Sequence, residues 1–185
     1  MDINKYRFFV IVQKNIAEKT LDQKQKDGFK YLLAKIEGLD LDKRWAAYII
    51  ATVWHDTLCA MQPISEKGSL RHFNNYENCN GNIFLGDGFL YRGRGYVPLV
   101  WKDNYQKFGR LLGIDLLGDP EVVLNPEIAW KILIAGMTGG LFTGDNLLKY
   151  FNDVNTDWIE ARKIINNSDD GEQIAEHAIK FYEAL

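Results

Sequence analysis

Hydrophobic residues recur every three to four positions over much of the chain, which is the spacing of amphipathic helices. On this pattern we expect helices over residues 22–37, 42–60, 103–112, 125–137, 157–165 and 171–184. Gly38 ends the first helix, and Pro63 forces the second to end nearby because proline cannot continue a helix. Asn125 as the N-cap and Pro126 in the first turn mark the start of the fourth. The pattern predicts a mainly α fold.

Residues 65–96 have a different texture, rich in glycine, asparagine, aspartate and aromatic residues. Their Gly-Asp-Gly, Asn-Gly-Asn and Gly-Arg-Gly stretches are turn signals around short strands. We interpret this region as loops with one small β-hairpin. Irregular segments on a rigid scaffold are where functional sites tend to lie, so we expect the site here.

Length and composition fit one domain over residues 1–185. The 185 residues, 46% of them hydrophobic and 13% aromatic, can bury a core without disulfides or metals. The net charge of −3 gives no cationic field that would attract nucleic acid or an anionic membrane. No segment approaches the ~20 apolar residues of a membrane helix. We therefore expect a soluble monomer with no nucleic-acid partner and no membrane insertion.

Two features bear on the compartment. The N-terminal apolar run covers only residues 8–12, too short for the core of a signal peptide, so we expect synthesis in a cytoplasm and action on a cell wall only after release by another factor. Cys59 and Cys79 are the only cysteines. They are most simply buried thiols in a reducing compartment, although a bridge between them is sterically possible.

Asp56 is a candidate for acid chemistry. It lies seven residues after Ile49 and three after Val53, so on a helix it shares their apolar face. Desolvation there would raise the pKa of its carboxyl, and a carboxyl that stays protonated near neutral pH can act as a general acid. The alternative is a helix-end aspartate bonded to nearby backbone or to Arg94.

Glu66 is the candidate partner. In a continuous helix it would lie ~15 Å beyond Asp56, too far to share a reaction centre. A chain reversal at Pro63 would let the two carboxyl groups approach the ~6.5 to 9.5 Å that leaves room for a water in an inverting glycosidase. The alternative is a solvated surface glutamate.

The most specific stretch is residues 91–105, which begins Tyr-Arg-Gly-Arg-Gly-Tyr and reaches Asn-Tyr at a predicted helix start. It resembles the signature of glycoside hydrolase family 19, shared by plant-type chitinases and phage endolysins. Residues 45–64, 136–144 and 161–166 also look like the endolysin branch. The resemblance implies a lysozyme-like or chitinase-like helical domain that cleaves β-1,4 bonds of peptidoglycan or chitin without a cofactor or metal.

The resemblance also implies roles for single residues. Asp56, between His55 and Thr57, stands where the family has its general-acid glutamate, and Glu66 would be the general base that activates water. The residues that would line or support the saccharide cleft are His55, Tyr91, Arg94, Tyr96, Asn104, Tyr105, Arg162 and Asn166.

Several positions depart from the family pattern. Asp56 is one methylene shorter than glutamate, and misplacement by ~1 Å can cost ~100-fold in rate. Pro98 and Val100 replace a glutamine and a serine or threonine, so an amide and a hydroxyl that would help to hold the attacking water are absent. Pro98 also lacks an N–H, which we expect to perturb strand pairing there. Asn167 replaces a glycine, and we expect this change to be tolerated because asparagine adopts a positive φ more readily than other L-residues.

These departures leave two hypotheses. The first is an inverting glycoside hydrolase with weakened activity. The second is a pseudoenzyme that uses the inherited cleft to bind a glycan or a protein. A metal-dependent phosphohydrolase built on His55 and Asp56 has less support, because His72 and His177 lack ligand-like spacing and no glycine-rich phosphate loop precedes a helix.

Overall fold

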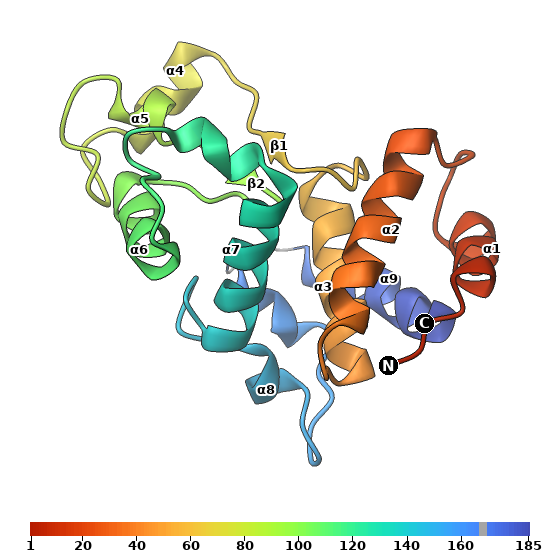
Figure 1. The fold of residues 1–185 in the computed structure, drawn as a ribbon. Helices are drawn as coiled ribbons and strands as arrows, with labels where there is room; N and C mark the ends of the chain where they lie inside the picture. Colours follow the sequence, from red (N-terminus) through yellow and green to blue (C-terminus); the bar gives the residue numbers. More distant parts are fainter. Residues whose placement is uncertain (167–169) are drawn as a thin grey trace. The chain divides into compact units, whose positions relative to one another are not determined.

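The computed structural model describes residues 1–166 and 170–185, and in them the chain is mainly helical (Figure 1), which confirms the predicted fold class. The chain forms two compact units, one made of residues 1–61 and 134–185 and the other of residues 62–133. The second unit is therefore inserted in the sequence of the first. A single domain over the whole chain stays a prediction.

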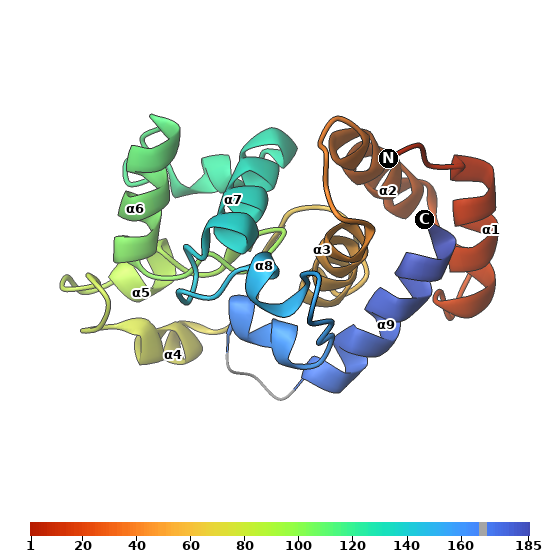
Figure 2. The same ribbon diagram turned by 90° about the horizontal axis from the view of Figure 1, so that it is seen from below.

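The first unit is built around helix α3 (Lys43–Asp56), in which every residue from 46 to 54 is buried. Helix α9 (Gly171–Ala184) packs along α3, and helix α1 (Lys5–Asn15) packs against α9 (Figure 1 and Figure 2). Helix α2 (Gln23–Glu37) adds another apolar face to this core. A helix that is buried almost all round, as α3 is, belongs at the centre of such a core.

Aromatic rings fill the space between these helices. The Phe29 ring lies 5.7 Å from that of Trp54 and 5.6 Å from that of Phe8, and the Phe8 ring lies 6.2 Å from that of Phe181. Helix α1 was not predicted, because its apolar residues form an unbroken run instead of a periodic stripe. Burial of Phe8 against two other helices stabilises α1, so tertiary packing decided what the local pattern did not.

Helix α3 ends at Asp56, not near residue 60 as predicted. Both the backbone N–H and the hydroxyl of Thr57 donate to the carbonyl of Val53, which closes the last turn. Leu58, Cys59 and Met61 then have φ values of 52°, 64° and 54°, in the left-handed region that no helix continues through. Asp56 is therefore the last helical residue, at the point where the chain turns away.

Helix α2 braces this turn. The Gln25 side chain donates to the carbonyl of Cys59 at 2.9 Å. A Cβ at Gly28 would lie 2.0 Å from the Met61 carbonyl oxygen, so only glycine allows the backbone of the turn to lie this close to α2. The start of α2 is as predicted, with Asp22 and Gln25 forming a reciprocal capping box.

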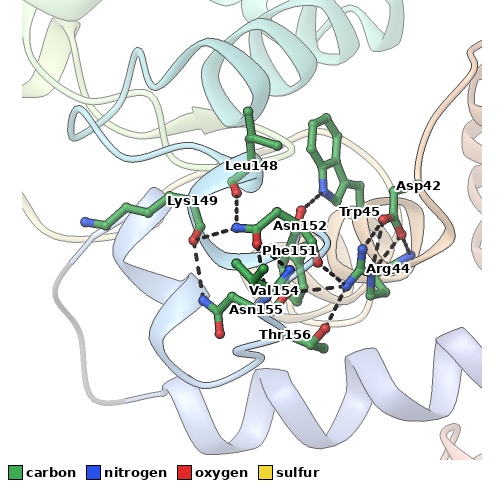
Figure 3. A network of polar contacts seen from close by, with 10 residues as sticks. All are labelled: Asp42, Arg44, Trp45, Leu148, Lys149, Phe151, Asn152, Val154, Asn155 and Thr156. Carbon is green, nitrogen blue, oxygen red and sulfur yellow. Dashed lines mark hydrogen bonds and ion pairs between the residues drawn. The ribbon is translucent and has the colours of Figure 1, made fainter.

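Arg44 and Trp45 tie the start of α3 to the segment after helix α8 (Leu147–Tyr150), as Figure 3 shows. The Arg44 guanidinium pairs with Asp42 and donates to the Asn152 carbonyl at 3.0 Å and to the Thr156 hydroxyl at 2.7 Å. The Trp45 indole N–H donates to the carbonyl of residue 151 at 3.0 Å. These contacts satisfy loop carbonyls that would otherwise face the helix without a donor.

The second unit contains a two-stranded antiparallel sheet of β1 (Ile64–Ser65) and β2 (Arg94–Gly95). Ile64 lies opposite Gly95 and Ser65 opposite Arg94. The expected small β region is present, but residues 66–93 connect its strands instead of a short turn. The Asn-Gly-Asn and Gly-Asp-Gly signals belong to this connection, whereas the Gly-Arg-Gly stretch runs into β2. The connection holds three short helices, α4 (Leu70–Phe73), η1 (Asn74–Tyr76) and α5 (Asp87–Leu90).

The remaining predicted helices are present with altered bounds. The structure has α6 (Lys102–Leu112), the short η2 (Pro120–Leu124), α7 (Pro126–Gly139), which holds residues of both units, and η3 (Glu160–Ile164), a 3₁₀ helix shorter than the predicted 157–165. Asn125 caps α7 as predicted, accepting from the N–H of Glu127 at 2.9 Å. No helix in residues 1–166 or 170–185 has both the length and the apolar character needed to cross a membrane.

Candidate active site

Asp56 lies in the first unit, where its carboxylate is held by Arg162 of η3. Arg162 Nη2 lies 3.0 Å from Oδ1 and Nη1 lies 3.2 Å from Oδ2, so the guanidinium fork grips both oxygens. The two side chains are 4% and 6% exposed. The predicted alternative, an aspartate bonded to Arg94, is wrong, since Arg94 pairs with Glu121 in the second unit.

Burial raises the pKa of Asp56 above its ordinary value, and the attraction and hydrogen bonds of Arg162 only partly offset this effect. The desolvation expected from the spacing to Ile49 and Val53 is thus confirmed. A raised pKa is the direction that a general acid requires. Neighbouring His55 has its Nε2 3.4 Å from an oxygen of Asp170, which orients the imidazole at the helix end.

Two hydroxyl groups of α3 are buried without partners. The Tyr48 and Thr52 hydroxyls accept and donate no hydrogen bond among the described residues. Burial raises the pKa of Tyr48, so its hydroxyl stays protonated at any physiological pH. Unsatisfied polar groups cost folding free energy, and they are found where a structure serves something other than stability.

Glu66 lies in the second unit, directly after β1. Its N–H donates to the carbonyl of Gly93 at 2.8 Å, and the Gly93 N–H donates back to Glu66 Oε2 at 3.1 Å. The other oxygen, Oε1, accepts from Nε2 of His72 at 2.8 Å and from the hydroxyl of Tyr76 at 2.9 Å. The side chain is 23% exposed. The reading of Glu66 as a merely solvated glutamate is therefore wrong.

Glu66 faces a pocket of about 500 Å³ lined by residues 64–68 together with Phe73, Phe89 and Arg92. The Arg92 guanidinium stacks over the Phe89 ring at 4.3 Å, and its Nε donates to the Ser65 hydroxyl at 3.1 Å. Lys67 is exposed beside it. The pocket thus joins one carboxylate, two cations and two aromatic rings.

Gly93 lies close to Glu66 and Pro98 beside this pocket. A Cβ there would lie 3.0 Å from Glu66 Oε2 and 3.1 Å from the Cβ of Pro98. Pro98 itself is exposed, in the turn that brings Leu99 back to donate to the Arg94 carbonyl at 3.0 Å. The expected perturbation of strand pairing by Pro98 is absent, because the pairing of β1 with β2 and the return bridge at Leu99 do not use its nitrogen.

Arg94 and Tyr105 form a buried network under the Gly93 loop. Arg94 is 1% exposed and donates to the carbonyls of Leu90 and Arg92, to the Tyr105 hydroxyl at 2.9 Å, and to Glu121 Oε1 at 2.6 Å. The Tyr105 hydroxyl in turn donates to the Arg92 carbonyl at 2.8 Å. Because both side chains are shielded from solvent, they support the loop that carries Gly93.

No family model matches the chain. An endochitinase of Arabidopsis thaliana is 35% identical to it over 92 residues, which cover 48% of this chain and 33% of that protein. A family 19 glycosyl hydrolase domain protein of Haemophilus influenzae is 41% identical over 56 residues, 30% of this chain and 27% of that protein. Chitinase C of Streptomyces griseus superposes with a TM-score of 0.64 at 23% identity, covering 98% of this chain and 90% of that one.

The chain is a relative of the family 19 glycoside hydrolases. The resemblance expected from residues 91–105 is thereby confirmed, and the likeness to chitinase C shows that the fold is that of a family 19 chitinase. The matched segments span about a third of the length of these two curated relatives.

The structure brings the predicted site residues together within each unit. His55, Asp56 and Arg162 meet in the first. In the second, Tyr91 packs its ring 5.4 Å from that of Tyr105. An approach of the Asp56 and Glu66 carboxyl groups stays a prediction, and so do the contacts of all these residues with a sugar.

The other family 19 positions have these surroundings. Asn104 donates from its side chain to the Val100 carbonyl at 2.9 Å, which fixes the residue that replaces the family hydroxyl. Tyr91 and Tyr96 are 4% and 1% exposed, so both belong to the core. Asn166 is exposed after η3. Asn167 lies outside the described residues.

Sequence reasoning missed three residues that hold the site together. His72 and Tyr76 bind Glu66 from α4 and η1, and Glu121 binds Arg94 from η2. Each is on a helix too short to show a hydrophobic period, so no sequence pattern predicts its place.

Among residues 1–166 and 170–185, no three side chains of histidine, cysteine, aspartate or glutamate are grouped so that they could hold a metal ion. Cys59 and Cys79 are both free thiols, but they have intermediate exposure and are not buried as expected.

Proposed function

We propose that the protein hydrolyses β-1,4 glycosidic bonds of peptidoglycan or chitin by inversion, with Asp56 as the general acid and Glu66 as the general base. The observation that carries the proposal is the contrast between two carboxyl groups. Asp56 is shielded from solvent and has a raised pKa. Glu66 is partly exposed and accepts three hydrogen bonds through its two carboxylate oxygens. Such a split of environments assigns acid and base roles.

In this mechanism Asp56 gives its proton to the leaving glycosidic oxygen. Glu66 removes a proton from a water that attacks the anomeric carbon from the opposite face, and the C–O bond to the leaving sugar breaks. Asp56 loses one proton and Glu66 gains one, and proton exchange with bulk water then restores both carboxyl groups. The geometry requires ~6.5 to 9.5 Å between the two carboxyl groups so that the water fits between them.

The same residues support a low rate. The Arg162 fork stabilises Asp56 as an anion, which is the form that cannot donate a proton. The shorter side chain also withdraws the acid from the position of a glutamate, and ~1 Å of misplacement can cost ~100-fold. Val100 offers no hydroxyl to the attacking water. These features weaken the chemistry without removing either carboxyl.

Peptidoglycan fits the pocket beside Glu66 better than chitin. Arg92 and Lys67 both lie there, and since Arg92 is already paired with Glu121 at 3.2 Å, the attraction rests mainly on the exposed Lys67. Chitin is uncharged, whereas the stem peptides of peptidoglycan carry carboxylates that these cations would attract. This preference favours an endolysin-type role.

A second function is favoured by the Asp56–Arg162 pair itself. If that pair keeps the acid ionised throughout, the protein binds a glycan or a protein partner without cleaving it. Binding of oligosaccharide with no release of reducing ends would establish this pseudoenzyme.

The deciding experiment is a reducing-end assay on peptidoglycan and on chitin oligomers, with NMR of the first anomer formed. We expect slow release of the inverted anomer and a loss of ~100-fold or more in Glu66→Gln, with Glu183→Gln, an exposed glutamate, unchanged. Unaltered turnover in Glu66→Gln would exclude Glu66 as the base. If the protein binds but does not cleave, the triple variant Asp56→Glu, Pro98→Gln and Val100→Thr should gain hydrolysis; a folded but inert triple variant would refute the assigned roles.

A further inference from the structure

We propose that His72 and Tyr76 are positioning residues for Glu66, and that they leave one lone pair of Oε2 as the place where the attacking water binds. The inference rests on the proposed function for its kinetic part and on the geometry around Glu66 for the rest.

The two oxygens of the Glu66 carboxylate accept different numbers of hydrogen bonds. An ionised carboxylate offers about four lone-pair sites, two on each oxygen. Oε1 accepts from His72 at 2.8 Å and Tyr76 at 2.9 Å, and is full. Oε2 accepts from the Gly93 N–H at 3.1 Å. Within the described residues one site remains, on Oε2, and Glu66 lines the pocket together with Arg92 and Phe89.

The fold holds both donors firmly. The Ser69 hydroxyl accepts from the backbone N–H of His72 and starts α4. The His72 ring packs edge-on against Phe73 at 5.1 Å and against Tyr76 at 5.7 Å. A Cβ at Gly68 would lie 2.7 Å from the His72 ring, so the chain passes close to one side of the ring. These contacts favour one orientation of the imidazole, whose side chain is 45% exposed.

Tyr76 is equally constrained. Its ring meets Trp101 edge-on at 5.9 Å and His72 edge-on at 5.7 Å. Burial, then the hydrogen bond to Glu66 and its charge, raise the pKa of Tyr76 to about 12, so the hydroxyl remains a donor at neutral pH. For His72 to donate as well, Nε2 must carry the hydrogen, which fixes the tautomer of the neutral ring as Nε2–H.

These donors determine where Glu66 points. The terminal torsion of a glutamate has a broad, shallow energy profile, so packing alone does not fix the plane of the carboxylate. Three donors set that plane: His72 from α4, Tyr76 from η1, and the N–H of Gly93 directly before β2. A base must lie within hydrogen-bond reach of its water at the right angle, and loss of that alignment lowers the rate of the chemical step more than substrate binding.

The kinetic test uses Tyr76→Phe and His72→Phe, which keep the rings and remove the donors, with His72→Gln as the conservative variant that can still donate. We expect kcat to fall ~10- to 100-fold in the two phenylalanine variants, KM to change less than about 2-fold, and His72→Gln to recover part of kcat. Tyr6→Phe, on an exposed tyrosine, is the matched control and should be unchanged. An equal kcat in all variants, or no recovery in His72→Gln with an intact melting temperature, would overturn the proposal.

A second measurement separates this inference from the proposed function. Imidazole ¹⁵N NMR of the full chain at about pH 8.5, where an ordinary imidazole is neutral, reads the tautomer of His72 directly. We expect Nε2–H, and a shift toward the other tautomer in Glu66→Leu. That result in a chain with no glycosidase activity would keep the positioning and refute the hydrolase. An Nδ1–H tautomer would refute the positioning whatever the activity.

Discussion

Arg162 holds Asp56 through both carboxylate oxygens, at 3.0 Å and 3.2 Å, with both side chains almost completely buried. The guanidinium opposes the effect of burial on the same carboxyl, and burial is the larger of the two. The residue that keeps the candidate acid in place therefore also limits how readily it donates a proton. The pH dependence of the free energy of unfolding depends on this balance.

The pH dependence of stability should report the raised pKa of Asp56. A carboxyl whose pKa is higher in the folded than in the unfolded protein stabilises the fold below the unfolded pKa, and that contribution is lost as the pH rises through the folded pKa. The free energy of unfolding should therefore fall with pH relative to Asp56→Asn, by at most about 1.4 kcal/mol per pH unit. Urea unfolding of both proteins between about pH 4 and pH 8 tests this. If the stability of the unsubstituted protein relative to Asp56→Asn rises with pH, the prediction is contradicted.

Glu121→Gln should destabilise the protein by about 1 to 2 kcal/mol. Arg94 is 1% exposed, and Glu121 is its anionic partner among the described residues, so the substitution leaves a buried cation facing a neutral amide. Because Glu121 is 55% exposed, water compensates for part of the loss. Glu160→Gln, in an exposed pair with Lys163, is the control and should change stability by less than about 0.5 kcal/mol. Equal effects in the two variants would show that the buried network is not what matters.

Tyr48→Phe should leave the protein as stable as before or stabilise it by up to about 1 kcal/mol. The Tyr48 hydroxyl is buried and has no partner in the described residues, so its removal relieves a desolvation penalty. Tyr105→Phe is the matched comparison, since the Tyr105 hydroxyl bonds Arg94 and the Arg92 carbonyl, and it should destabilise. Thermal unfolding distinguishes the two. A clear loss of stability in Tyr48→Phe would reveal a partner for this hydroxyl.

Lys67→Gln should lower activity on peptidoglycan several-fold and leave activity on chitin oligomers nearly unchanged. The reason is the loss of one of two cations at the pocket beside Glu66. Raising the salt concentration should likewise reduce the preference of the unsubstituted protein for peptidoglycan over chitin oligomers, because ions screen exposed charges. Lys30→Gln, on the exposed face of α2 in the first unit, serves as control. A parallel loss on both substrates would refute charge recognition.

Local signals in the sequence predicted the parts of the fold that local signals determine. The hydrophobic spacing and Gly38 predicted the span of α2, and the spacing of Asp56 to Ile49 and Val53 predicted its desolvation. The early end of α3 was not predictable, because its left-handed turn is held by α2 through Gln25.

The partners of the site residues escaped prediction for a related reason. Arg162 is far from Asp56 in the sequence and meets it only in the folded unit. His72 and Tyr76 lie nearer to Glu66 along the chain, yet short helices without a period placed them. Long-range ion pairs and irregular turns leave no repeating pattern, so only the family resemblance pointed to Arg162.

The unequal oxygens of Glu66 set a rule for designing inhibitors. A compound that offers a donor to Oε1 meets an atom already saturated by an imidazole and a phenol, and would have to displace one of them. A compound that offers a donor to Oε2 finds a lone-pair site that no described residue fills. A ligand would therefore bond the two oxygens with unequal ease, even though a free carboxylate is symmetric.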